Sequence, residues 1–421
     1  MGRLVARSFW AEGISRLGDA ISVVAIPFTA VLVLDASPGE LALIGAAQAL
    51  PILLLSIPAG ALVDRRASRW PILVAADLAR AALLLVVPAA AALGLLSLPL
   101  LAAVALGTSV AGTFFDLAYA GWLPRLLQGD DLHRANARVE LARSVAAVSG
   151  PAAGGVLVAL LTAPLALIAD ALSFVASAVL VGSVRRREPP TVKSTTTSPA
   201  VGRRVELAAG MRFIAGQPLV RAVTATAGVN NLARSIAMGV AVLYLVDVAR
   251  LSPGEIGLAF GLGHTGYLAG ALVSRRLSSR LGMGRTMQLG IAVFGPSMLL
   301  FAIAPAPLAG IAFTAMVFAH GFGISVHNVN QVTVRQLLTP DHLRARVAAV
   351  FRLVIFGAIP VGTVIGGLVA EVWGLRAALV ISGLGLLLGS TPYLAVRIGR
   401  LRSIDELTRP ALEPRPEAAP G

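Results

Sequence analysis

The residues with the clearest capacity for chemistry are a few ionisable side chains inside long apolar stretches. Asp19 lies about ten residues into the apolar segment 9–34, and Arg16 lies one turn earlier on the same helical face. Arg234 lies at a similar depth in the segment 219–246. Charge inside a bilayer tends to be functional, so we expect Asp19 to bind and release a proton, with Arg16 or Arg234 setting its pKa. A permanent structural ion pair between these segments is the alternative.

A second group of polar residues could line a cavity for a small-molecule substrate. It consists of Asn230, Asn231, His320, His327, Asn328 and Gln331. His320 and His327 share a helix face, but metal ligands on one helix usually lie four residues apart, and no nearby carboxylate completes a site. We therefore expect a polar cavity wall or a proton relay, with no metal and no cofactor. Hydrogen-bonded helix packing is the alternative.

Three further charged residues inside apolar segments are expected to be structural. Asp77 and Arg80 lie one turn apart in the segment 71–94, which favours an ion pair. Asp170 lies in the segment 164–184 and can accept hydrogen bonds from hydroxyl groups or from an arginine.

The segments that carry these residues are too apolar for a water-soluble fold. The chain has 421 residues, of which 57% are hydrophobic and 13% charged, whereas a soluble domain carries roughly 25% charged residues. A spanning helix needs roughly 20 mostly apolar residues. Twelve segments meet that requirement: 9–34, 40–63, 71–94, 97–121, 139–161, 164–184, 219–246, 255–274, 285–304, 307–334, 347–370 and 374–397.

We therefore expect an all-α membrane protein with twelve transmembrane helices in two pseudo-symmetric six-helix bundles. The bundles would occupy residues 1–184 and 219–397. The polar stretch 185–218 between them predicts a linker that contains a short amphipathic helix, Glu206–Gly216. The polar, Pro-rich tail 398–421 is typical of a disordered segment.

The distribution of arginine predicts the orientation in the membrane. Arginine clusters in alternate loops, in the linker and near both ends of the chain, whereas the opposite loops hold only Arg250 and Arg376. Since basic loops stay in the cytoplasm, both termini are expected there, in a multi-pass protein of the inner membrane. The first apolar segment lacks a small-residue cleavage site, so we interpret it as a retained helix.

The net charge of +14 does not indicate a nucleic-acid partner. The charge lies where membrane topology requires it, and no recognition helix or basic stripe with interleaved aromatic residues accompanies it. The expected partners are the lipid bilayer and a small-molecule substrate, with protons as the coupling ion. The chain contains no cysteine, which excludes disulfides and thiolate metal sites. A monomer is expected.

Two motifs recur in the second half of the chain. GALVDRRASR (Gly60–Arg69) recurs as GALVSRRLSSR (Gly270–Arg280), and LLQGDDLHRANA (Leu126–Ala137) recurs as LLTPDHLRARVA (Leu337–Ala348). Both offsets are about 210 residues, half the chain length, and each copy would hold six spans. This predicts parallel repeats related by an axis along the membrane normal, which is a recognised transporter design.

The first copy of the loop motif has a candidate gating role. Gly60 permits close helix packing, and Asp64 can accept hydrogen bonds from a neighbouring helix N-terminus. Arg65 and Arg69 can reach carboxylates on adjacent helices, where Asp116 is the expected partner. Such a cluster would latch the two halves when a cytoplasmic gate is shut. An ordinary solvated turn with arginines that fix topology is the alternative.

The motif GPAAGG in the segment 139–161 has two interpretations. Its small residues Gly150, Gly154 and Gly155 allow close helix approach, and Pro151 disrupts the local hydrogen-bond ladder. A bend there could act as a hinge while the halves rock. A packing groove with no gating role is equally compatible with these residues.

Together these motifs resemble the major facilitator superfamily. GALVDRRASR is similar to that family's loop signature, although Ala67 stands where the family commonly has glycine, and Ser274 replaces the aspartate in the second copy. GPAAGG resembles the antiporter motif, which the family associates with export. The stretch from PRLLQGDDLHRANA to GPAAGG resembles the macrolide-efflux and enterobactin-exporter-like branch. The resemblance covers nearly all of residues 8–397 and implies transport by alternating access, with helices 1, 4, 7 and 10 around a central cavity.

The function expected from these features is proton-coupled efflux of a bulky amphipathic molecule, such as a drug or a siderophore-like metabolite. The chain has no phosphate-binding loop of the G-x-x-x-x-G-K-S/T form, which disfavours an ATP-driven pump. No convergent nucleophile and base are apparent, so we expect no enzyme. Uptake of a polar nutrient and lipid flipping by the same fold remain alternatives, as does a receptor or scaffold that transports nothing.

Overall fold

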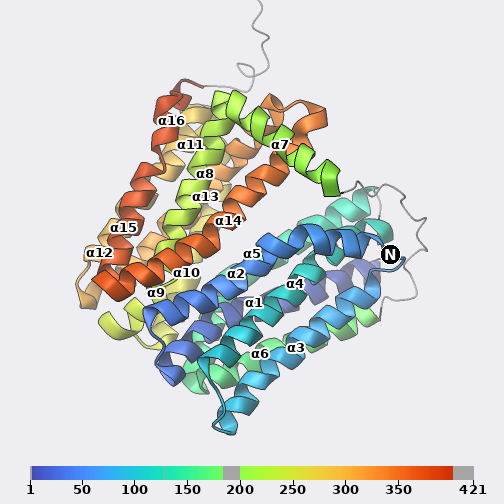
Figure 1. Ribbon diagram of the computed structural model, residues 1–421, viewed down its shortest axis with the longest axis vertical. Helices are drawn as coiled ribbons and strands as arrows, with labels where there is room; N and C mark the ends of the chain where they lie inside the picture. The colour runs from blue at the N-terminus through green and yellow to red at the C-terminus, as the bar shows by residue number, and fades with distance from the viewer. Residues whose placement is uncertain (1, 128, 184–199, 402–421) are drawn as a thin grey trace, which may run out of the picture.

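The computed structural model describes residues 2–127, 129–183 and 200–401, and every regular element in these ranges is helical (Figure 1). Twelve of the helical segments are long and apolar enough to cross a membrane. The predicted all-α fold with twelve spans is therefore confirmed. The predicted linker residues 185–199 and the tail residues 402–421 lie outside the described part of the chain.

The first six spans form one bundle, which we call the N-lobe. Its helices are α1 (Gly2–Leu34), α2 (Pro38–Asp64), α3 (Trp70–Ala92), α4 (Leu98–Leu126), α5 (Gly129–Leu160) and α6 (Ala163–Gly182). Within it, α1 packs on α5 and α6, while α3 packs on α4 and α6.

The last six spans form the second bundle, the C-lobe. It consists of α8 (Pro218–Met238), α9 (Ala241–Leu243), a π-helical turn (Tyr244–Val248), α10 (Pro253–Leu281), α11 (Met283–Ala292), α12 (Phe294–Ile303), a 3-10 turn (Ala306–Leu308), α13 (Ala309–Leu338), α14 (Asp341–Trp373), α15 (Leu375–Leu388), α16 (Thr391–Ala395) and a final 3-10 turn (Ile398–Arg400).

Corresponding helices of the two lobes begin with the same local signal. The sequence Ser-Pro-Gly-Glu starts α2 at Ser37 and α10 at Ser252. In both copies the serine side chain accepts from the glutamate backbone N–H, and the serine backbone N–H donates to the glutamate carboxylate. This reciprocal capping box satisfies N–H groups that a helix start otherwise leaves unbonded, and proline suits the first helical turn.

Prolines inside the spans differ in their effect on the helix. Pro27, Pro88, Pro151 and Pro360 lie within helices that continue through them. The ninth span instead breaks at Val293, between α11 and α12. Pro296 has no N–H to donate to the carbonyl four residues earlier, which explains why the ladder is interrupted there.

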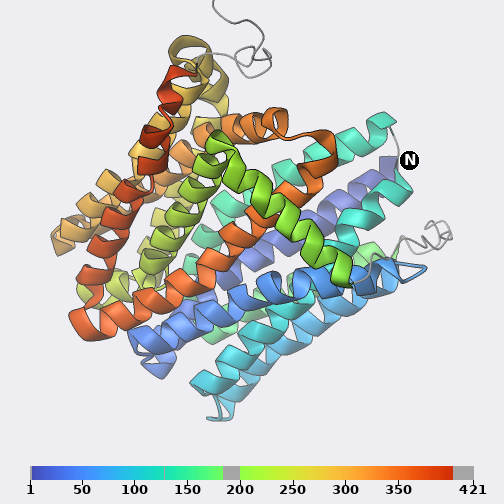
Figure 2. The same cartoon turned by 45° about the horizontal axis from the view of Figure 1, so that its top comes forward.

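The lobes touch each other through α2 with α14 and through α5 with α10. The loops after α2, α4, α10 and α13 share one end of the molecule, the arginine-rich end, and the loops after α1, α3, α5 and α14 share the other, the arginine-poor end. Figures 1 and 2 show the bundles close together near α9 and the start of α2, and further apart toward α7 (Ala200–Gly216).

Helix α7 includes the predicted amphipathic segment Glu206–Gly216 and extends it by six residues. It packs on the beginning of α14, where the Arg346 guanidinium lies 4.0 Å from the Glu206 carboxylate. Ile214 is buried with Val347 and Val350 in a small apolar cluster. The helix is thus held by the C-lobe at the arginine-rich end.

Candidate functional site

Two connected cavities lie on the inner side of the N-lobe. The deeper one has a volume of about 350 Å³ and is lined by residues of α1, α2, α3, α4 and α6. The larger one, about 900 Å³, lies between the lobes and also touches Leu207 of α7 and Arg352 and Phe356 of α14. Arg16, Ile52 and Asp116 line both, so we treat them as one central cavity.

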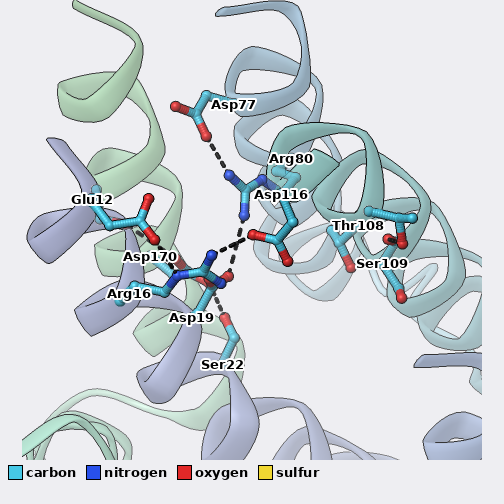
Figure 3. Close-up of polar contacts among 12 residues, drawn as sticks. Glu12, Arg16, Asp19, Ser22, Asp77, Arg80, Thr108, Ser109, Asp116 and Asp170 are labelled. Carbon is cyan, nitrogen blue, oxygen red and sulfur yellow. Dashed lines mark hydrogen bonds and ion pairs between the residues drawn. The ribbon is translucent and has the colours of Figure 1, made fainter. Parts of the chain in front are cut away.

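Arg16 is the hub of an ion-pair network in this cavity (Figure 3). Its Nε donates to Glu12 Oε1 at 2.9 Å, one turn earlier on α1. Its two terminal nitrogens reach carboxylates on either side: one bonds Asp116 of α4, and the other lies 3.4 Å from Asp19 Oδ2. The guanidinium fork therefore ties α1 to α4.

Arg80 of α3 is the second cation of the network. It bonds Asp77 on its own helix, as the spacing predicted, and its Nη1 also lies 3.4 Å from Asp19 Oδ1. Its guanidinium carbon stacks 3.9 Å from the centre of the Phe174 ring and 4.7 Å from that of Phe115. Aromatic faces stabilise a cation that has left water.

Asp170 of α6 lies at the edge of the same cavity and is held by hydroxyl groups. It accepts hydrogen bonds from Ser22 of α1 and from Ser173 Oγ at 3.1 Å. Gly18 makes this approach possible, because a Cβ there would collide with Ser173 and Asp170. The predicted hydroxyl partners of Asp170 are thus Ser22 and Ser173.

The carboxylates of the network differ in exposure. Glu12, Asp77 and Asp170 are at most 1% exposed, whereas the side chains of Asp19 and Asp116 are 35% and 52% exposed. Glu12 also accepts from Arg143 of α5 at 2.9 Å. Asp19 has only the two long contacts of 3.4 Å, so it is the most loosely held carboxylate that reaches the cavity.

The network holds more acidic than basic groups. Among the described residues in or next to the cavity, five carboxylates face four guanidinium groups: Glu12, Asp19, Asp77, Asp116 and Asp170 against Arg16, Arg80 and Arg143 of the N-lobe and Arg352 of the C-lobe. A partly enclosed site with surplus carboxylates attracts protons or an organic cation. No cluster suited to a metal ion is found among the described residues.

The predicted pairing of Arg234 with Asp19 is wrong. Arg234 of α8 lines a separate small pocket inside the C-lobe, together with His264, Tyr267 and His320. The partners of Asp19 are Arg16 and Arg80, both in the N-lobe. Both helices carry charge inside their spans, as expected, but the neighbours of each charged residue lie within its own bundle.

Several polar residues predicted to line the cavity are used in packing. His327 is 3% exposed, and its Nε2 lies 3.3 Å from the Tyr393 hydroxyl inside the C-lobe. Asn230 is 5% exposed and donates to the Thr226 carbonyl. Gln331 is also 5% exposed. His327, Asn230 and Gln331 are therefore better described as residues of the helix packing than as residues of a cavity wall.

The remaining polar candidates differ from each other. Asn231 is half-buried and donates to the Ala227 carbonyl at 2.9 Å. Asn328 is exposed. His320 does line a cavity, but it is the C-lobe pocket and not the central one.

The loop motif also differs from the expectation in its partners. Asp64 accepts from Arg69 at 2.6 Å within the same loop, and Arg65 is exposed. Asp116, the expected partner of these arginines, bonds Arg16 instead. A Cβ at Gly60 would meet no atom within 4 Å, so this glycine is not needed for close packing in this conformation.

The GPAAGG motif lies in two helix contacts at once. Gly150 and Gly154 face α1: a Cβ at Gly150 would collide with Ala20, and a Cβ at Gly154 would lie a tight 3.1 Å from Ile21. Gly155 faces the other lobe, where a Cβ would lie 2.7 Å from the Gly257 Cα atom of α10. Helix α5 runs through Pro151 without a break. The motif therefore joins the two lobes as well as two helices of one lobe.

Sequence reasoning missed Glu12 and the link from Arg80 to Asp19. Glu12 lies four residues before Arg16, a spacing that places both on one helix face. That signal was present in the sequence. The sequence held no comparable signal for the contact between Arg80 and Asp19, because that contact depends on how α3 is rotated within the bundle.

Comparisons with known proteins agree with this architecture. A family model described as a transmembrane secretion effector matches residues 2–419. The multidrug efflux pump Tap of Mycolicibacterium fortuitum is 29% identical over 406 residues, which cover 93% of this chain and 95% of the pump. The uncharacterized MFS-type transporter YfiS of Bacillus subtilis strain 168 is 25% identical over 400 residues, or 93% of each chain.

The fold also matches solved structures. A crystal structure of a bacterial homologue of the iron transporter ferroportin, in its inward-facing state, superimposes with a TM-score of 0.75 at 17% identity. The match covers 95% of this chain and 99% of that one. The resemblance first seen in the loop and GPAAGG motifs is thereby confirmed. The chain belongs to the transmembrane secretion effector family, in the efflux-like branch of the major facilitator superfamily of transporters.

Proposed function

We propose that this transporter exports a bulky amphipathic small molecule in exchange for protons, by alternating access of the central cavity. The observation that carries the proposal is the pair of partly exposed carboxylates, Asp19 and Asp116, held next to arginines in the central cavity, whose wider part lies between the two lobes. Exposed acid groups at this depth supply a binding site for a proton or for an organic cation.

The cavity's position supports loading from one side. The lobes are in contact near the arginine-poor end, where Glu371 of α14 accepts from Ser37 Oγ and from the Gly39 N–H, each at 3.1 Å. The cavity extends instead toward α7 and the start of α14. We assign the arginine-rich end to the cytoplasm of a cell whose inner membrane holds the protein, because basic loops stay on that side. The conformation is then open to the cytoplasm, ready to receive a molecule for export.

The contacts of Asp19 suit it to exchange a proton. Protonation of Asp19 removes two contacts of 3.4 Å and leaves Arg16 bonded to Glu12 and Asp116, and Arg80 bonded to Asp77. Both arginines therefore keep a carboxylate partner when Asp19 is protonated. The network therefore tolerates a change in the charge of Asp19 better than a change at the buried Asp77 or Glu12.

The cavity wall and the relatives support export of an amphipathic molecule. Ile52, Leu53, Leu117, Leu353 and Phe356 give the cavity a largely apolar lining around its charged floor. The named relatives that resemble this chain over most of their length include multidrug efflux pumps. Uptake of a polar nutrient loses its main support, because His327 and Gln331 are buried in packing away from this cavity.

The test uses everted membrane vesicles with an imposed pH gradient, acidic inside, and a panel of amphipathic fluorescent dyes. Wild-type vesicles are expected to accumulate dye only while the gradient lasts. Asp19→Asn is expected to abolish this gradient-driven accumulation. Asp35→Asn is the matched control, because Asp35 is exposed in the loop after α1 and its positive φ of 48° suits asparagine. Equal gradient-driven accumulation in wild type and Asp19→Asn would remove Asp19 from the coupling role.

A further inference from the structure

The small pocket inside the C-lobe has no role in the proton exchange proposed above. It has a volume of about 50 Å³, and its polar lining is formed by Arg234 of α8, His264 and Tyr267 of α10, Ser297 of α12 and His320 of α13. Aromatic and sulfur-containing side chains complete the wall, among them Phe260 and Phe294. The space is enough for one carboxylate-sized group, since a water molecule takes up about 30 Å³.

Arg234 has no counter-ion in the described part of the chain. No hydrogen bond or ion pair joins it to any described residue, although it lies in a membrane-spanning helix and is half-buried. All four acidic residues in the described part of the C-lobe lie at or near helix ends: Asp247, Glu255, Asp341 and Glu371. Arg16 and Arg80 of the N-lobe, in contrast, each contact at least two carboxylates.

The neighbours of Arg234 are suited to an anion and not to a cation. His320 packs against Phe294 with ring centres 4.4 Å apart and the ring planes tilted by 39°, and its ring N–H can donate a hydrogen bond into the pocket. His264 Nδ1 lies 2.7 Å from the Phe260 carbonyl and donates to it, which fixes the orientation of that ring. The pocket thus combines a fixed cation with hydrogen-bond donors, and it contains no carboxylate.

This pocket is the repeat counterpart of the deeper N-lobe cavity. His320, Phe294 and Leu386 line the pocket, and Ser109, Leu84 and Phe174 line the cavity. Each pair is separated by about 210 positions, the offset of the repeated loop motifs, as expected for parallel repeats. The two lobes therefore carry equivalent sites of opposite charge: surplus carboxylates in the N-lobe, and an arginine without a carboxylate in the C-lobe.

We propose that the C-lobe pocket binds the acidic group of a zwitterionic substrate, with Arg234 as its counter-ion. The inference rests on the proposed export function and names its substrate class. The surplus carboxylates of the N-lobe are suited to the basic group of the same molecule. A guanidinium can hold a carboxylate through two parallel hydrogen bonds, which fixes the orientation of the molecule as well as its charge.

The test measures binding of two matched dyes to the purified full-length chain in lipid nanodiscs by fluorescence anisotropy. Rhodamine B is a zwitterion at neutral pH, and its ethyl ester has the same ring system and positive charge but no carboxylate. Arg234→Gln is expected to weaken rhodamine B binding by about 10- to 100-fold, the effect of losing a hydrogen bond to a charged group. Binding of the ester is expected to stay within about two-fold of wild type.

Two further variants separate a specific contact from a general loss of charge. Arg234→Lys keeps the cation and is expected to retain most of the preference for rhodamine B. Arg376→Gln removes the same charge from an exposed site at the start of α15 and is expected to change neither dye's affinity.

The outcomes distinguish this inference from the proposed function. Equal weakening of both dyes by Arg234→Gln, or no weakening of either, would overturn the anion site. Wild-type binding of the ester alone would also overturn it while leaving export of amphipathic cations intact. Failure of the wild-type protein to bind or accumulate either dye would count against the proposed function itself. Replacement of chloride by gluconate should leave rhodamine B affinity unchanged or increased, whereas a decrease would assign the pocket to an inorganic anion and overturn the proposal.

Discussion

Gly155 of α5 and Gly257 of α10 face each other across the boundary between the two lobes. A Cβ built on either residue would lie 2.7 Å from the Cα atom of the other. No side chain larger than hydrogen fits there without moving a helix. The antiporter-like motif is therefore part of the lobe interface at the closed end of the molecule, where small residues allow two helix backbones to approach closely.

The first prediction concerns this contact. Gly257→Val is expected to push α10 away from α5, because the nearest atoms to the new side chain are backbone atoms of Pro151 and Gly155. The arginine-poor end should open and the arginine-rich end should narrow, with loss of transport. Because the chain has no native cysteine, spin labels at Arg65→Cys and Arg275→Cys report the width of the arginine-rich end specifically.

Gly182→Val is the control for this substitution, because a Cβ at Gly182 meets no atom within 4 Å. The label distance should shorten in Gly257→Val and stay at the wild-type value in Gly182→Val. An unchanged distance in both variants would mean that the glycine contact does not set the lobe arrangement.

The second prediction concerns the buried pair of Asp77 and Arg80. Their side chains are 0% and 4% exposed. Asp77→Ala leaves Arg80 with only its 3.4 Å contact to Asp19 and two aromatic faces. Removal of one partner of a buried ion pair typically lowers the free energy of unfolding by about 3–5 kcal/mol. The thermal unfolding midpoint in detergent should fall by several degrees.

Asp64→Ala is the matched control for Asp77→Ala. Asp64 also pairs with an arginine, Arg69, but its side chain is 70% exposed. Exposed ion pairs contribute about 0–1 kcal/mol to the stability of a fold, so the thermal unfolding midpoint should hardly change. If both variants unfolded at the same temperature, burial would not be what gives the Asp77 pair its importance.

The third prediction compares two carboxylates that share Arg16. Glu12 is 0% exposed and bonds both Arg16 and Arg143, whereas Asp116 is 52% exposed and bonds Arg16. Glu12→Gln should therefore lower the unfolding midpoint clearly, because two cations lose a buried anion. Asp116→Asn should leave stability nearly unchanged. A larger loss of stability in Asp116→Asn than in Glu12→Gln would contradict this ranking.

The sequence predicted the elements well because a spanning helix is recognised from its length and composition alone. The relation between elements was harder to predict. In a water-soluble helix the apolar face marks the core, but here the lipid-facing side is as apolar as the buried side. The pattern therefore could not tell that His327 turns toward Tyr393, or that Arg234 turns toward His320 and not Asp19.

Contacts within one helix were predictable where contacts between helices were not. Arg16 with Asp19, and Arg80 with Asp77, follow from a spacing of three residues. The bonds from Arg16 to Asp116 and from Arg80 to Asp19 join residues far apart in the chain. They depend on how α1, α3 and α4 are rotated and stacked, which the spacing of residues along one chain does not specify.

The last prediction concerns the polar clasp at the arginine-poor end. Glu371 near the end of α14 accepts hydrogen bonds from Ser37 Oγ and from the Gly39 N–H at the start of α2, each at 3.1 Å. A carboxylate at a helix N-terminus is favoured by both the unpaired N–H groups and the helix dipole. The clasp therefore stabilises the conformation in which this end is closed.

Glu371→Ala is expected to shift the population toward molecules that are open at the arginine-poor end, because it removes both hydrogen bonds of the clasp. A hydrogen bond to a charged acceptor stabilises a fold by about 1.5–3 kcal/mol when it is buried. The bonds of Glu371 are exposed, so their contribution is smaller. Spin labels at Leu95→Cys and Leu308→Cys, on exposed loops of the two lobes, should report a new population at longer distance. Glu371→Gln keeps an acceptor oxygen but not the charge, so it should produce a smaller shift. Identical distance distributions in wild type and Glu371→Ala would contradict a role of this clasp in keeping the end closed.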